Sequence, residues 1–117
     1  MRQWLDAGIV VSAGSNTPAA IYDPEHPFIG LFMLSDNLSK VGQLVSGQAI
    51  SRRELLEIYT RNSAYAMKRE HEFGTLAENM LADFIVVDTD LLDCEPQELH
   101  DAKVLATYLG GELVYER

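Results

Sequence analysis

Apolar positions along the chain fall into short runs, and the spacing within each run predicts its secondary structure. Residues 2–7 are expected to end a helix, with Gly8 as the stop residue. Residues 9–11, Ile-Val-Val, are continuous and β-branched, which is typical of a strand buried on both faces of a parallel sheet. Residues 14–27 contain three prolines and begin with Gly-Ser-Asn-Thr, which predicts a long loop, where function is often found. Residues 28–39 are richly apolar and are expected to form a helix.

The strongest helical pattern covers residues 51–67. Ser51 and Glu54 form the S-x-x-E signature of a capping box, which satisfies two backbone donors at a helix start. Apolar residues then recur at helical spacing, while Glu57 and Arg61 lie four apart in the order that favours an ion pair. We therefore expect one continuous helix here.

The period of the pattern changes after this helix, and three strands are predicted. Residues 82–88 predict the first strand, and residues 91–100 predict a polar connection. Residues 104–109 and 112–115 predict a hairpin around the Gly-Gly pair at 110–111. These strands are expected to form a separate small sheet at the end of the chain.

Composition and charge exclude several classes of function. The 117 residues are 47% hydrophobic and 23% charged, as in a folded globular protein. The net charge of −9 argues against binding to a nucleic-acid backbone or to an anionic membrane surface. No apolar run approaches a membrane span, no signal peptide is visible, and Cys94 has no second cysteine to pair with. We expect a cytoplasmic protein.

Four stretches of the sequence carry a resemblance to a known family. They are G-I-V-V-S-A-G-S-N-T-P at 8–18, T-R-N-S-A-Y-A at 60–66, F-G-T-L-A-E-N-M-L-A-D-F-I-V-V-D at 73–88 and V-L-A-T-Y-L-G-G-E-L-V-Y at 104–115. In this order and spacing they resemble the C-terminal end of the amidohydrolase superfamily, in particular the family 3 branch of exoenzyme-regulatory-like, metal-dependent hydrolases.

The resemblance implies an α/β fold in two parts. Members of this family have a TIM-like (β/α)₈ barrel and a composite β-sandwich that is built from both ends of the chain. Residues 1–72 would then be the C-terminal part of the barrel, with its last strand, a loop and helices. Residues 73–117 would be strands of the β-sandwich.

The resemblance also implies a chemistry. Family members hold one or two metal ions, commonly zinc, with a His-x-His pair and further histidines, and an Asp ends the eighth barrel strand. That Asp takes a proton from a metal-bound water, which attacks an amide or related C–N bond. The ion lowers the pKa of the water and polarises the carbonyl.

This sequence departs from the family pattern at the catalytic position. The expected G-S-D is G-S-N, which places Asn16 where the family has its metal-contacting Asp. A neutral amide is a weak metal ligand and cannot act as a general base, so this position is interpreted as degenerate. The alternative is an ordinary turn asparagine that caps local backbone. His26, His71 and His100 are spread along the chain without a His-x-His pair, so no metal or other cofactor is expected in this chain.

Other candidate residues have simpler explanations. Cys94 lies between two acidic residues, which disfavour a thiolate nucleophile. Residues 70–72, Glu-His-Glu, lack the H-E-x-x-H pattern of a metal site and are expected to be a solvated helix end, while His100 is expected in a turn. Asn79 stands where the family has a glycine, and asparagine tolerates the left-handed backbone that such a turn needs.

Three hypotheses for function follow. The first is the C-terminal segment of an amidohydrolase-like protein, inactive alone, which associates as a homo-oligomer or with the missing N-terminal barrel portion. The second is a non-enzymatic assembly or partner-binding module derived from that fold. The third is a hydrolase that is assembled in trans with an N-terminal barrel fragment.

Overall fold

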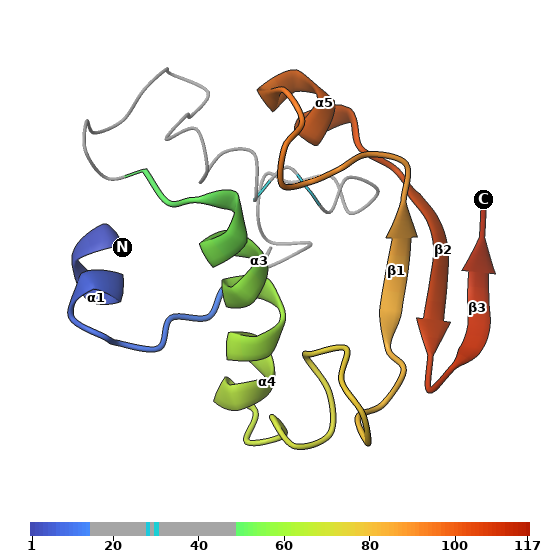
Figure 1. Ribbon diagram of the computed structural model, residues 1–117, viewed down its shortest axis with the longest axis horizontal. Helices are drawn as coiled ribbons and strands as arrows, with labels where there is room; N and C mark the ends of the chain where they lie inside the picture. Colours follow the sequence, from blue (N-terminus) through green and yellow to red (C-terminus); the bar gives the residue numbers. More distant parts are fainter. Residues whose placement is uncertain (15–27, 29, 31–48) are drawn as a thin grey trace.

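The computed structural model describes residues 1–14, 28, 30 and 49–117, with the helices before the sheet on one side and the sheet on the other (Figure 1). The elements in chain order are α1 (Arg2–Asp6), α3 (Arg52–Tyr59), α4 (Arg61–Ala66), β1 (Phe84–Val87), α5 (Pro96–Asp101), β2 (Val104–Leu109) and β3 (Glu112–Glu116). Most of the loop predicted at 14–27 and of the helix predicted at 28–39 lies outside the described residues. The described part of the chain contains no helix long and apolar enough to cross a membrane.

Helix α1 ends as the sequence predicts. Gly8 has a φ of 74°, which is the left-handed region that glycine adopts without steric cost. The Gly8 N–H donates to Leu5 O at 2.9 Å, and the Ile9 N–H donates to Trp4 O at 2.9 Å. These two bonds form a Schellman motif, so the prediction of Gly8 as the stop residue is confirmed.

The strand predicted at residues 9–11 does not form. Residues 9–14 have no regular secondary structure, and Ile9 and Val10 are each about half exposed, while Val11 is buried. A β-strand exists only through hydrogen bonds to a neighbouring strand, and within the described residues none lies beside this segment. The prediction of a doubly buried strand is therefore wrong for this chain.

The helix predicted at 51–67 is two helices. Its capping box is confirmed, because the Glu54 N–H donates to Ser51 Oγ and the Ser51 N–H donates to Glu54 Oε2. The break falls at Thr60, which has φ −115° and ψ −89°. The Thr60 hydroxyl donates to Leu56 O at 2.6 Å, a bond that competes with the helical pattern and bends helices. The expected pair of Glu57 and Arg61 spans the break at 2.9 Å.

A helix replaces part of the polar connection predicted at residues 91–100. Helix α5 begins at Pro96, where the missing N–H costs nothing. The Glu95 N–H donates to Glu98 Oε2 at 2.8 Å, which completes a capping box, and Leu99 is buried. The E-P-x-E pattern at 95–98 explains this helix start, so the segment predicted as a polar connection contains a helix.

The C-terminal sheet is confirmed, with strand order β1-β2-β3 and antiparallel pairing throughout. Gly110 and Gly111 both have positive φ, as a two-residue hairpin turn requires. The Phe84 ring stacks on Tyr108, its direct partner in the register, with ring centroids 4.5 Å apart. Asn79 has a φ of 67°, so it does adopt the left-handed backbone expected of it.

The described hydrophobic core lies between α3, α5 and the near end of the sheet. Leu55, Ile58 and Leu99 are its fully buried side chains. Val11 and other buried residues complete the cluster, and Val87 and Val104 from the sheet pack against it. This core therefore connects the sheet, both helices and the irregular segment that leads to Gly14.

Candidate functional site

Asn16, the candidate catalytic position, follows the described segment 9–14 in the sequence. Asn16 and His26 are outside the described residues, so the interpretation of Asn16 as a degenerate catalytic position stays a prediction. What the structure does show is how the segment leading to Gly14 is held in place.

Helix α4 holds this segment through two polar side chains. The Asn62 side-chain amide donates to Val11 O at 2.9 Å. Ser63 Oγ lies 2.9 Å from Ile58 O and 3.5 Å from Ala13 O. With Val11 also in the core, residues 11–13 are fixed against α4 by side chains rather than by a neighbouring strand.

Removing the Asn62 amide is expected to destabilise the protein moderately. Asn62→Ala leaves the part-buried Val11 carbonyl without this donor, which costs about 1–2 kcal/mol in the free energy of unfolding. Urea denaturation measures the change. The matched control is Gln97→Ala, because within the described part of the chain the Gln97 amide bonds only to the exposed Asp101 carboxylate, at 3.1 Å. Equal losses in the two variants would contradict a tethering role for Asn62.

The histidines are not brought together. His71 lies in the turn region after α4, its side chain is exposed, and its nearest ion-pair partner is Glu70 at 3.8 Å. His100 lies in α5 rather than in the expected turn, with Nδ1 2.6 Å from Asp101 Oδ1. Across residues 1–14 and 49–117, no three His, Cys, Asp or Glu side chains gather in a way that could hold a metal ion. The described residues therefore do not fit a metal centre.

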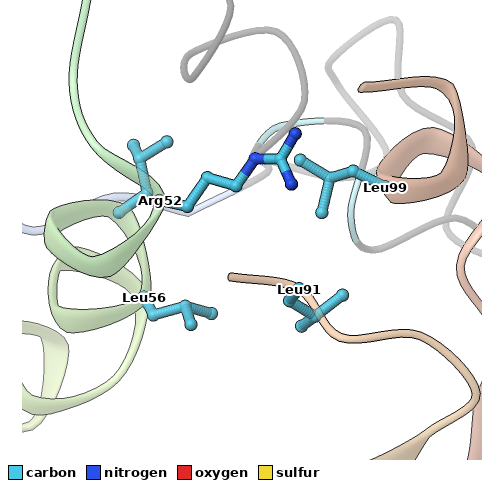
Figure 2. Close-up of a pocket in the computed structure, with 5 residues that line it drawn as sticks. Arg52, Leu56, Leu91 and Leu99 are labelled. Carbon is cyan, nitrogen blue, oxygen red and sulfur yellow. The ribbon is translucent and has the colours of Figure 1, made fainter. Parts of the chain in front are cut away.

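Cys94 has a basic neighbour that the sequence did not indicate. Arg52 at the start of α3 donates to Cys94 O, and its Nη1 is also 3.1 Å from Cys94 Sγ. The Arg52 side chain extends from α3 toward Leu99 over a shallow pocket (Figure 2) that is lined by Arg52, Leu55, Leu56, Leu91 and Leu99. Because four of its five lining residues are leucines, this pocket offers packing rather than acid–base chemistry.

The acidic residues at both ends of β1 have structural partners. Asp83 Oδ1 accepts the Gly110 N–H at 2.6 Å and so ties the hairpin turn to the start of β1. Asp88 Oδ1 accepts the Lys103 N–H at 2.9 Å, and this bond and the Thr89 hydroxyl lower the pKa of Asp88. These carboxylates therefore organise the sheet and are not candidates for catalysis.

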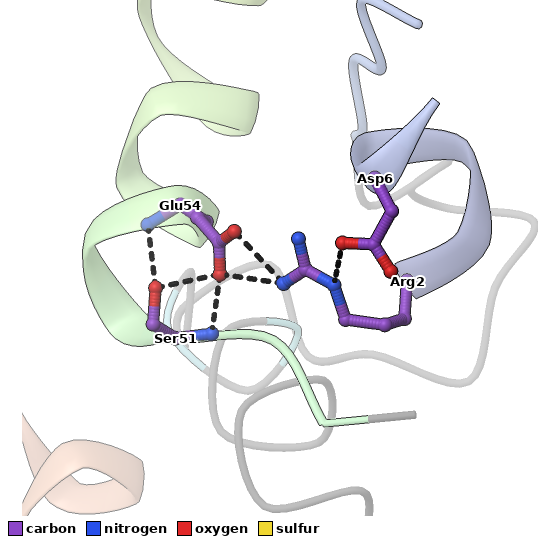
Figure 3. A network of polar contacts seen from close by, with 4 residues as sticks. All are labelled: Arg2, Asp6, Ser51 and Glu54. Carbon is purple, nitrogen blue, oxygen red and sulfur yellow. Dashed lines mark hydrogen bonds and ion pairs between the residues drawn. The ribbon is translucent and has the colours of Figure 1, made fainter. Parts of the chain in front are cut away.

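A second polar network joins α1 to the start of α3 (Figure 3). Arg2 Nη1 lies 2.8 and 2.9 Å from the two carboxylate oxygens of Glu54, and Arg2 Nε lies 2.8 Å from Asp6 Oδ1. The hydrogen bond from the Ser51 hydroxyl, and then the one from Arg2, lower the pKa of Glu54 to about 2. Glu54 therefore both caps α3 and anchors α1.

The lowered pKa of Glu54 predicts a specific pH dependence. Glu54 stabilises the fold fully above its unfolded pKa of about 4.5, and this contribution is lost as the pH falls toward about 2. The difference in urea midpoint between wild type and Glu54→Gln is therefore expected to shrink as the pH is lowered from neutral to about 2. Glu57→Gln is the control, because it removes only the exposed pair with Arg61. A pH-independent difference for Glu54→Gln would contradict the prediction.

Comparison with known proteins shows what the chain is related to. The sequence pattern of the amidohydrolase family matches residues 1–115. This chain belongs to the amidohydrolase family. The resemblance found in the sequence motifs is therefore confirmed, and amidohydrolases are generally metal-dependent enzymes.

Two curated relatives show what share of a longer related protein the chain matches. It is 35% identical to an N-substituted formamide deformylase from Arthrobacter pascens over 117 residues, which are 100% of this chain and 21% of the relative. It is 34% identical to the protein LONG AFTER FAR-RED 3 from Arabidopsis thaliana over 95% of this chain and 19% of that protein. The chain thus spans about a fifth of the length of these relatives.

A solved structure supports the fold of this amidohydrolase segment. The crystal structure of an amidohydrolase from Thermotoga maritima matches 97% of this chain and 24% of its own chain, with a TM-score of 0.64 and 19% identity. At this identity the match shows the fold alone. The mixed arrangement of helices and sheet is therefore one that occurs within an amidohydrolase.

Proposed function

We propose that this chain is the C-terminal part of a metal-dependent amidohydrolase-like protein and is inactive alone. In this proposal residues 1–72 end the barrel and residues 73–117 contribute strands to the β-sandwich. The complete protein hydrolyses non-peptide C–N or amide bonds. The observation that carries the proposal is the match to the amidohydrolase family over residues 1–115, in a chain that spans about a fifth of its relatives.

The arrangement of residues 9–14 supports this interpretation. The segment is held in place by Asn62 and by burial of Val11, while Ile9 and Val10 remain about half exposed. A β-branched run that is fixed in position and lacks a strand neighbour among the described residues is suited to receive one. In the proposal that neighbour comes from the rest of a barrel. Any metal ion would then be held by residues beyond those described.

Complementation in trans tests the proposal. The N-terminal portion of the Arthrobacter deformylase, without the segment that matches this chain, is mixed with this chain and zinc. The mixture is assayed on N-substituted formamides and N-acyl amino acids. We expect no turnover by the chain alone, and turnover by the mixture once Asn16→Asp restores a carboxylate. The gain over Asn16 is expected to be about 10²-fold or more, as for other general bases.

The outcomes of this experiment separate the candidate functions. Turnover by the isolated chain would contradict the proposal that the chain is inactive alone. Complex formation without turnover, even with Asn16→Asp, would favour the second candidate, which is a non-enzymatic assembly module that derives from the amidohydrolase fold. The specific observation in favour of that candidate is the sequence G-S-N at 14–16, which supplies no general base.

A further inference from the structure

Among the described residues, the outer edge of β3 has no neighbouring strand, and β3 carries apolar side chains. β3 has β2 as its sheet neighbour and lies on the side of the sheet away from α3 and α4 (Figure 1). All five of its residues are exposed, with Leu113 at 47%, Val114 at 58% and Tyr115 at 45%. An exposed apolar edge of this kind is a template for pairing with another strand.

The register shows which main-chain groups point to this open edge. The Arg117 N–H donates to Leu105 O at 2.9 Å, so Arg117 and Tyr115 direct their main-chain groups at β2, and Glu116 directs its groups outward. At the turn, Glu112 closes the two-residue hairpin against β2, which leaves Leu113 directed outward. The register shifts between the pairs Thr107–Tyr115 and Tyr108–Leu113. Val114 is therefore the bulged residue and has no partner in β2.

We propose that β3 pairs antiparallel with β3 of a second copy of this chain, about a two-fold axis that passes between Val114 and Tyr115. The outward main-chain groups of Leu113 then pair with those of Glu116 in the second copy. By symmetry, those of Glu116 pair with those of Leu113 in the second copy. A two-fold axis perpendicular to the sheet places the same face of both sheets on the same side, and the contact is isologous because both copies use the same strand. The contact joins two three-stranded sheets into one six-stranded sheet.

Charge complementarity favours a second copy as the occupant. In this register Glu112 lies opposite Arg117 of the second copy, twice by symmetry, and opposite charges that face each other across strands stabilise the pairing. Neither side chain has an ion pair with another described residue. The neighbouring two-fold registers have less favourable charge pairing. One places Glu116 opposite Glu116 of the second copy, and the other leaves Arg117 without a partner across the contact.

This contact gives a specific surface to the homo-oligomer that the first sequence hypothesis expects of a chain inactive alone. Sedimentation velocity at increasing concentration is expected to show a reversible dimer of the wild-type chain. Glu112→Arg and Arg117→Glu each place like charges opposite each other at both ends. Each is expected to raise the dimer dissociation constant about tenfold or more. The double variant Glu112→Arg/Arg117→Glu restores opposite charges and is expected to return the constant toward that of the wild type.

Glu78→Arg is the control, because it makes the same charge change at an exposed residue before β1. It is expected to leave the dissociation constant unchanged. Amide hydrogen exchange gives a second measurement, in which dimer formation protects the Leu113 and Glu116 N–H groups. A monomer at all concentrations, or a dimer that both single variants leave intact, would overturn the contact. Such a result leaves the hydrolase proposal standing, because complementation with the barrel portion decides that question separately.

Discussion

Leu55→Ala is expected to lower the free energy of unfolding by about 2–5 kcal/mol. Leu55 is 0% exposed and belongs to the cluster that also contains Ile58 and Leu99. Removing the Leu55 side chain leaves a cavity where α3 meets α5. The loss of stability therefore includes the cost of this cavity in addition to the transfer free energy of the removed atoms. The fully buried side chains of the described core are few, so little remains to compensate. Urea denaturation followed by circular dichroism measures the change.

Leu76→Ala is the matched control for this substitution. It deletes the same atoms from a side chain that is 69% exposed, so its effect is expected within about 0.5 kcal/mol of zero. A comparable loss in both variants would mean that burial between α3 and α5 does not determine the stability of this chain.

Gly74→Ala is expected to cost about 2–4 kcal/mol, from two separate causes. Gly74 has a φ of 96°, where a side chain is strained. An added Cβ would also lie 2.7 Å from Ala64 Cβ and 3.2 Å from Arg61 Cα. The chain after α4 therefore returns so closely over the break at Thr60 that only glycine fits. The midpoint of thermal unfolding and the urea midpoint both measure the loss.

Gly8→Ala separates these two causes. Gly8 has a φ of 74°, but an added Cβ there meets nothing within 4 Å. Its substitution therefore tests backbone strain alone and is expected to cost about 1–2 kcal/mol. If Gly74→Ala were no more destabilising than Gly8→Ala, then the close contact with α4 would have no energetic role.

Local signals in the sequence predicted most of the elements correctly. The hairpin at residues 104–116 depends on a Gly-Gly turn between two β-rich runs, and the start of α3 depends on residues within one turn of each other. The same kind of signal occurs at 95–98, where the capping pattern E-P-x-E begins α5. Interactions of this short range need no knowledge of the rest of the fold.

Two predictions went wrong because hydrophobic periodicity shows neither whether a strand has a neighbour nor where a helix breaks. The run at 9–11 has the composition of a buried strand, but its outcome depends on whether a neighbouring strand is available. The continuous helix predicted at 51–67 breaks at Thr60, where the Thr60 hydroxyl bonds to Leu56 O and where Gly74, fourteen positions later, packs closely against the chain. Periodicity carries no information about either contact.

The sequence by itself determined the family of this protein, the C-terminal sheet, and the caps of α1 and α3. These depend on residue identity and on contacts between near neighbours. Only the tertiary structure showed that Asn62 holds the segment before Gly14, that Arg52 contacts Cys94, and that β3 has an edge with no strand beside it in the described part of the chain. Those features join residues from separate elements, and their geometry exists only after the hydrophobic core has brought the elements together.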